Sequence, residues 1–153
     1  MDIKSIARSL CQASLAIALA CASQPAWASH WFMTGLVENG TRIAGLDQDS
    51  IAAGTDGSLE VTLISYAISS RGVASKVTAD LEVDCTKEKF QQVRLTIAHQ
   101  DGRHATILSR GPDWDDPANA TDAALLQAAC SGNLSGLTDL KTDSPDHYAA
   151  NYR

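Results

Sequence analysis

The residues of this chain whose type suggests chemistry most directly are its cysteines. Four are present: Cys11, Cys21, Cys85 and Cys130. Cys85 closes an alternating apolar segment, LEVDC, and Cys130 closes a segment of small residues, LLQAAC. A cysteine can bind a metal, act as a nucleophile or form a disulfide, and the compartment of the protein helps to decide between these roles.

The first 28 residues have the composition of a secretory signal peptide. Lys4 and Arg8 form a short basic region, and the apolar segment IARSLCQASLAIALACA follows. Small residues in the sequence AWA then provide a cleavage site before Ser29. The apolar segment is too short and too interrupted to cross a bilayer, which needs about 20 apolar residues. We therefore predict export, most simply to the periplasm, and no membrane span.

An alternative processing site lies at Cys21, in the sequence IALAC. A lipoprotein signal would be cleaved before this cysteine, which would then carry acyl chains in the outer membrane. Such signals usually have a branched apolar residue three positions earlier, where this chain has Ala18. Lipidation of Cys21 stays open as an alternative to cleavage before Ser29.

Cleavage before Ser29 leaves 125 residues with two cysteines, Cys85 and Cys130. Paired thiols in an exported chain usually form a disulfide, and no CxxC spacing suggests zinc or thioredoxin-like chemistry. Closing the loop between them restricts the unfolded chain by about 4 kcal/mol in the chain-entropy model. We predict a structural disulfide between Cys85 and Cys130.

The charge of the chain excludes some partners. Removal of residues 1–28 changes the formal net charge from −6 to −7, because Lys4, Arg8 and Asp2 are lost. Such an acidic chain is a poor general binder of nucleic acid or anionic membranes. The 86–110 segment is an exception, with a local charge of +3. It is either an ordinary solvated surface or a modest basic face for an acidic partner.

Evidence for catalysis or for a metal is weak. The motifs GxSxG and HExxH and a phosphate-binding glycine loop are absent from the sequence. Asp113, Asp115 and Asp116 lie close together but lack the spacing of a calcium loop. His99 and His104 flank a turn and could meet across a hairpin, although no third ligand suggests itself. We predict no catalytic residue, no metal and no cofactor.

Alternation of apolar and polar residues predicts six strands. The clearest case is SKVTADLEVDC, where Val77, Leu81, Val83 and Cys85 share one face with other apolar residues. Asn39-Gly40 indicates a hairpin turn, whereas 46–58 has the turn residues of a loop. The predicted strands cover residues 30–37, 41–46, 58–68, 75–85, 91–99 and 104–109.

One helix is predicted after the strands, at 121–132. Thr121 is the expected N-cap and Gly132 the expected stop, and Ala123, Leu126 and Cys130 share one stripe with Gln127. A disulfide from Cys130 to Cys85 would dock this stripe on the apolar face of the sheet. Residues 133–153 are polar without a sustained period, and we expect a mostly flexible tail in which Leu134, Leu137 and Leu140 could form a turn. The fold class is thus α+β, with domain 29–132 between a signal and a tail.

The residues from Trp31 to Cys130 resemble the surface-adhesin protein E-like family of exported bacterial proteins. The resemblance rests on the order and spacing of HW, LDQDSI, VTLISYA, SKVTADLEVDC, PDWDDP and LLQAAC. Its most specific element is Asp84-Cys85 followed by Trp114 and the final Cys130. The resemblance implies a small antiparallel sheet with a C-terminal helix tethered by a disulfide, in agreement with the fold expected from the pattern.

The resemblance also implies a function. Founding members of the family are outer-membrane lipoproteins that bind host matrix proteins, and their binding region overlaps the basic stretch of this chain. The candidate contact residues are Lys87, Lys89, Arg94 and Arg103. We predict a non-catalytic binding module of the cell envelope for a protein or polyanionic partner. The alternative is a soluble periplasmic structural or accessory protein whose partner is another envelope component.

The mass of the exported protein, purified from its own cells without reductant, tests the predicted processing. We expect a mass that begins at Ser29 and is two hydrogens below the reduced value, because the signal is cleaved and the two remaining cysteines are joined. A mass that begins at Cys21 with added acyl chains would instead establish the lipoprotein alternative. A mass that includes Met1 would contradict both.

Overall fold

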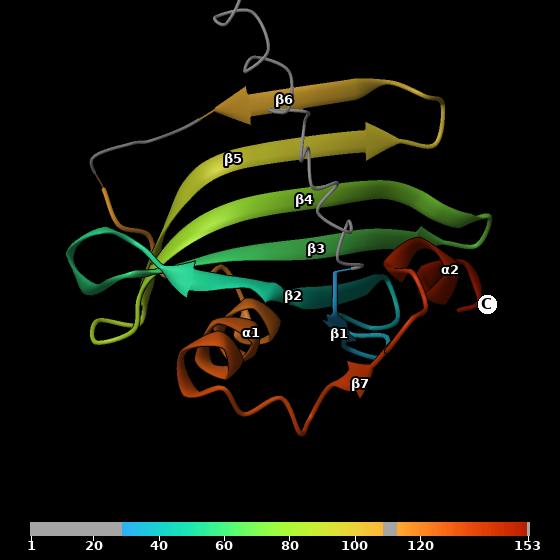
Figure 1. Cartoon of the computed structure of the whole chain (residues 1–153). Coiled ribbons are helices and arrows are strands. Elements are labelled where there is room, and N and C mark those ends of the chain that lie inside the picture. The colour runs from blue at the N-terminus through green and yellow to red at the C-terminus, as the bar shows by residue number, and fades with distance from the viewer. Residues whose placement is uncertain (1–28, 109–112, 153) are drawn as a thin grey trace, which may run out of the picture.

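The computed structural model describes residues 29–108 and 113–152, which contain one antiparallel sheet (Figure 1). Seven strands follow one another across the sheet in the order β6-β5-β4-β3-β2-β1-β7, so nearly all neighbours in space are also neighbours in sequence. The strands are β1 (Trp31–Met33), β2 (Arg42–Ala53), β3 (Leu59–Ser69), β4 (Gly72–Asp84), β5 (Lys89–His99), β6 (His104–Leu108) and β7 (Thr138–Asp139).

Three short helical segments complete the described fold: η1 (Thr55–Gly57), α1 (Ala120–Ser131) and α2 (Pro145–Ala150). The predicted α+β class and the single antiparallel sheet are confirmed, and the six predicted strands correspond to β1 to β6. The seventh strand and the second helix both come from the segment expected to be a tail. No helix in the described ranges has the length and apolarity needed to cross a bilayer.

The central strands bury both of their faces, at different places. One face, called the α1 face, carries the buried side chains Ala44, Leu46, Val61, Leu63, Leu81 and Val83. The opposite face, called the α2 face, carries the buried side chains Met33, Ile43, Ile64 and Tyr66. Successive side chains of a strand alternate between faces, so β2 and β3 contribute to both clusters. The predicted alternation over 75–85 is confirmed in that Leu81 and Val83 are buried on the α1 face, with Cys85 packed against them.

The prediction of a loop over 46–58 is wrong for its first half, because β2 continues to Ala53. Its pairing with β3 is shifted between Asp47 and Ala52, and side chains replace the missing ladder bonds. The Ser50 hydroxyl accepts a bond from the Thr62 N–H at 2.7 Å and donates to the Asp47 carbonyl. The Asp47 carboxylate accepts the Asp49 N–H at 3.1 Å. Polar residues typical of turns therefore form a bulge within a strand.

Helix α1 packs on the α1 face, but not as predicted. Its N-cap is Asn119 rather than Thr121, since the Asn119 side chain accepts the Asp122 N–H at 2.9 Å. Gly132 ends the helix in the left-handed conformation, with φ 68°, as expected. The buried positions are Leu125, Leu126, Ala128 and Ala129. The predicted packing stripe is therefore rotated, and its members Ala123 and Gln127 are exposed.

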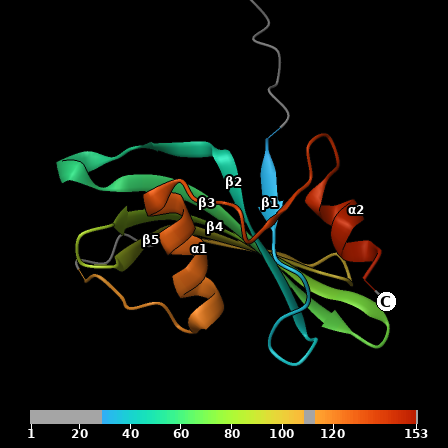
Figure 2. The same ribbon diagram turned by 90° about the horizontal axis from the view of Figure 1, so that it is seen from below.

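The expectation of a flexible tail is wrong for most of residues 133–153. Strand β7 pairs with β1, and the Leu140 N–H donates to the Trp31 carbonyl at 3.0 Å. Helix α2 then packs on the α2 face, where Leu140 and Ala149 are buried (Figure 2). A Ser144 N-cap followed by Pro145 begins this helix, and both are local sequence signals for a helix start.

A polar clamp fastens α2 to the sheet. The buried Tyr66 hydroxyl donates to the Asp146 carboxylate at 2.5 Å, and the Lys76 ammonium donates to the same carboxylate at 2.8 Å. Burial alone would raise the pKa of Asp146, but hydrogen bonds from Lys76 and Tyr66 outweigh it and lower this pKa. Burial and the bond to Asp146 raise the pKa of Tyr66, which keeps its hydroxyl a donor.

Replacement of Leu140 by Ala tests the packing of the C-terminal segment. Leu140 is only 8% exposed, and we expect Leu140→Ala to lower the free energy of unfolding by about 2 to 4 kcal/mol, because it leaves a cavity under α2. Urea unfolding followed by circular dichroism measures the change. The matched control is Leu36→Ala, where the side chain is 44% exposed and the change should be small. Equal stability of both variants would contradict the packed C-terminal segment.

Candidate binding groove

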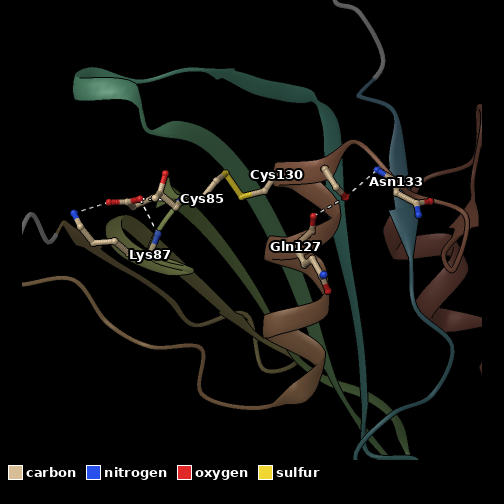
Figure 3. Close-up of a disulfide and its surroundings, with 8 residues drawn as sticks. Cys85, Lys87, Gln127, Cys130 and Asn133 are labelled. Atoms are coloured by element: carbon tan, nitrogen blue, oxygen red, sulfur yellow. Dashed lines mark hydrogen bonds and ion pairs between the residues drawn. A yellow bond between two sulfur atoms is a disulfide. The ribbon is translucent and has the colours of Figure 1, made fainter.

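The disulfide between Cys85 and Cys130 joins the end of β4 to the last turn of α1, with a Cα–Cα distance of 5.6 Å. Figure 3 shows the sulfur atoms bridging the two elements, with Lys87 beyond Cys85 and Gln127 one turn before Cys130. The predicted pairing is confirmed. The two cysteines are 45 residues apart in sequence, so this bond fixes the last turn of α1 to a strand that is distant in the chain.

A groove of about 670 Å³ lies between α1 and the turn that joins β4 to β5. Its apolar lining consists of the disulfide together with Val83, Pro117, Ala120, Ala123 and Leu126. The predicted helix stripe of Ala123, Leu126, Gln127 and Cys130 therefore does form one surface, but that surface lines the groove. Volume and apolar lining are in the range of pockets that hold small molecules or a few peptide side chains.

Charged and polar side chains surround this apolar surface. Lys87 and Glu88 lie on the side of the β4–β5 turn, and Asp116 lies on the segment that leads into α1. Asn119 and Gln127 add amide groups from the helix. The Lys87 ammonium binds the Asp84 carboxylate at 2.7 Å, and this bond with backbone donors lowers the pKa of Asp84. The rim thus offers charges of both signs together with neutral donors and acceptors.

The helix that forms one wall of the groove is held at its N-terminal end as well. The Arg42 guanidinium, which is 19% exposed, binds Asp122 in the first turn of α1 at 2.6 Å. The same guanidinium donates to the Ser65 hydroxyl at 2.7 Å, so the helix is tied to two strands. Burial would lower the pKa of Arg42, but bonds to Asp122 and Glu38 raise it. Tethers at both ends make this wall of the groove a fixed surface.

The four predicted contact residues do not form one face. Lys87 lines the groove, and Lys89 binds the groove residue Asp116 at 3.2 Å. Arg94 lies farther along β5 and binds Asp80 at 3.6 Å. Arg103 lies in the β5–β6 turn at the other end of the hairpin and binds Asp101 at 2.7 Å. Since β5 rises about 3.3 Å per residue, roughly 30 Å separates this turn from the groove.

The structure also shows where the residues considered as metal ligands lie. Strand register puts Ala98 opposite His104, so His104 lies on the α2 face while His99 lies on the α1 face, and the two cannot meet as a metal pair. Asp115 uses its backbone to bridge Phe90, with N–O distances of 2.8 and 3.0 Å. Within residues 29–108 and 113–152, no group of three or more His, Cys, Asp or Glu side chains could hold a metal ion.

Several groove residues could not be predicted from the sequence. Glu88 lies in the β4–β5 turn, whereas Asp116 and Asn119 lie just before α1, and no local spacing marks these two segments as neighbours. The helix stripe was the one local signal, because Ala123, Leu126 and Cys130 follow the period of a helix. This period predicted that the residues share one surface of the helix. It did not show that the surface lines a groove instead of packing on the sheet.

Comparisons with models of protein families, with curated proteins and with solved structures gave no match to this chain. The resemblance to the surface-adhesin protein E-like family stays a prediction from the motifs. The predicted signal peptide and the lipidation alternative at Cys21 lie outside the described residues.

Removal of the disulfide tests its contribution to the stability of the fold that contains the groove. The double variant Cys85→Ser/Cys130→Ser should lose about 3 to 4 kcal/mol of unfolding free energy, because the unfolded chain regains the entropy of an open loop. Urea unfolding with and without reductant is the measurement, and reductant should weaken the wild type but leave the variant unchanged. Unchanged stability of the variant would contradict a structural role for the bond.

Proposed function

We propose that this chain is a non-catalytic, exported binding module of the bacterial cell envelope. In this proposal the groove between α1 and the β4–β5 turn holds a short segment of a partner protein. The observation that supports it best is the combination of an apolar, covalently tethered surface with a rim of amides and opposite charges. Such a rim can satisfy the backbone and polar side chains of a peptide while apolar side chains enter the groove.

A protein segment suits this site better than a polyanion does. Lys87, Lys89, Arg94 and Arg103 each have a carboxylate within ion-pair distance, so their charges are already compensated. A polyanion would have to compete with each of these carboxylates. The groove itself carries Lys87 against Glu88 and Asp116, which favours a ligand without a large net charge.

The lining also supports binding rather than chemistry. Both sulfurs in the groove are held in the disulfide, and no histidine is among the described lining residues. Nucleophilic catalysis generally needs a nucleophile within hydrogen-bond reach of a base. The proposal therefore includes neither a reaction nor a cofactor. The resemblance to the adhesin family suggests a host matrix protein as partner, and a periplasmic location suggests another envelope protein.

Filling the groove with a large side chain tests the proposed site. Ala123 is exposed and lines the groove, whereas its neighbour Ala124 is exposed on the same helix outside it. Peptides from a phage-displayed random library, selected on the oxidised wild type, are the probe. We expect Ala123→Trp to lower their binding at least about tenfold by occupying their volume, and the matched Ala124→Trp to leave it unchanged.

Charge substitutions separate the groove from a general basic face. Lys87→Ala should reduce binding of the same peptides, while Arg103→Ala, about 30 Å away, should not. Equal binding to wild type and Ala123→Trp would contradict the groove as the site. Equal loss in Lys87→Ala and Arg103→Ala would support the extended basic face instead.

A further inference from the structure

Strand β6 forms one edge of the sheet and has no described partner on its outer side. It pairs with β5 alone, and all five of its residues are exposed. In Figure 1, β5 and β6 lie beyond the part of the sheet that α1 and α2 accompany. The opposite edge is different, because β7 is only two residues long. Strand β6 is therefore a five-residue edge strand without a described partner on its outer side.

The register shows which backbone groups point outward from this edge. The His99 N–H donates to the Arg103 carbonyl at 2.9 Å, so His99 and Arg103 face each other as a hydrogen-bonded pair. Hydrogen-bonded and non-bonded pairs alternate along an antiparallel ladder. Ala105 and Ile107 consequently bond to β5, whereas His104, Thr106 and Leu108 turn their N–H and C=O groups away from it. No hydrogen bond to those outward groups is found within the described residues.

This edge lacks the usual protection against pairing. Exposed edges commonly carry a lysine, a proline, a bulge or an inward charge, and the sequence HATIL of β6 has no charged residue and no proline. Its pairing with β5 is regular over all five residues. Ile107 is 47% exposed and Leu108 is 75% exposed. Among the described residues, the neighbouring Arg94 and Arg103 are each paired with a carboxylate, so their charges repel a similar edge only weakly.

We propose that β6 pairs antiparallel with β6 of a second copy of this chain, on a two-fold axis through Thr106. Thr106 of each copy would then face Thr106 of the other as a hydrogen-bonded pair, with His104 opposite Leu108 on either side. The outward backbone groups of both strands would form about six new hydrogen bonds, because all three pairs are of the bonded type. The sheets of the two copies would become one continuous sheet.

Side chains on both faces suit this arrangement. A two-fold axis perpendicular to the sheet keeps the α1 faces of both copies on the same side. There, the small Ala105 lies opposite the large Ile107 of the other copy, and Leu95 and Ile97 extend the apolar row into β5. On the α2 face the central pair is threonine with threonine, which packs well across strands. No position of β6 brings two like charges together.

A second copy suits this edge better than an isolated peptide strand. Peptides that add to a sheet edge obtain specificity from pockets for alternate side chains, and no residue of β6 lines the groove described above. A second copy brings a β5–β6 hairpin that is already ordered, so less conformational entropy is lost. The contact is small, at or below the roughly 1,200 Å² of weak complexes, and we expect a micromolar dimer.

Sedimentation of the chain, exported with its own N-terminal segment and purified in its oxidised form, tests the proposal. At about 100 μM we expect a mass approaching twice that of the monomer, and dissociation on dilution. Thr106→Lys and Thr106→Glu should each weaken the dimer at least about tenfold, because equal charges would face each other on the axis. An equal mixture of the two variants should restore dimers, since opposite charges then meet.

The matched control is Thr106→Val, which keeps the outward N–H and the β-branched shape and should still dimerise. Circular dichroism and the melting temperature of each variant verify that the monomer fold is intact. A wild type that stays monomeric at 100 μM, roughly the concentration at which a micromolar dimer is saturated, would overturn the proposal. Dimers that persist equally in both charged variants would place the contact elsewhere. A mixture that stays monomeric would refute the axis through Thr106.

Discussion

The covalent bond between Cys85 and Cys130 is the constraint on which the position of α1, and with it the groove, depends. It holds the end of α1 against the end of β4, while the Arg42–Asp122 ion pair holds the first turn of the helix. A twelve-residue helix is too short to be stable alone, so its position comes from these tethers and from burial of Leu125 and Ala129. The groove exists because the two tethers leave a space between the helix and the β4–β5 turn.

The two faces of the sheet are covered at different places, and this arrangement leaves part of the sheet bare. Helix α1 and helix α2 cover opposite faces of the central strands, with Tyr66 and Leu140 in the second cluster. Neither helix lies beside β6 or most of β5 in Figure 1. In β5, Arg94 and His99 are exposed and the other residues are half-buried. The same lack of cover leaves all five residues of β6 exposed.

The proposed function depends on the fact that the positive charges of this region are neutralised by nearby carboxylates. The four cations suggested by the sequence are spread over the length of the β4–β6 region, and each is paired with an aspartate. A local excess of positive residues in sequence therefore does not become a continuous basic surface. What remains at the groove is an apolar surface with balanced charges, which matches a protein segment better than a polyanion. Likewise, the balanced charges near β6 permit two copies of a net acidic chain to approach.

The sequence by itself determined the strands with clear alternation, the helix with its Gly132 stop, and the pairing of the two cysteines. These features depend on local period, on local turn residues or on the small number of thiols, so they can be seen without the fold. Tertiary structure decided the remaining features. Residues 47–53 continue a strand because Ser50 and Asp47 supply bonds across a bulge. Ser144 and Pro145 mark the start of α2 locally, but β7 and the docking of α2 depend on contacts with β1, Tyr66 and Lys76, which are distant in sequence. The groove, likewise, joins segments that are distant in sequence, and only their packing makes them neighbours.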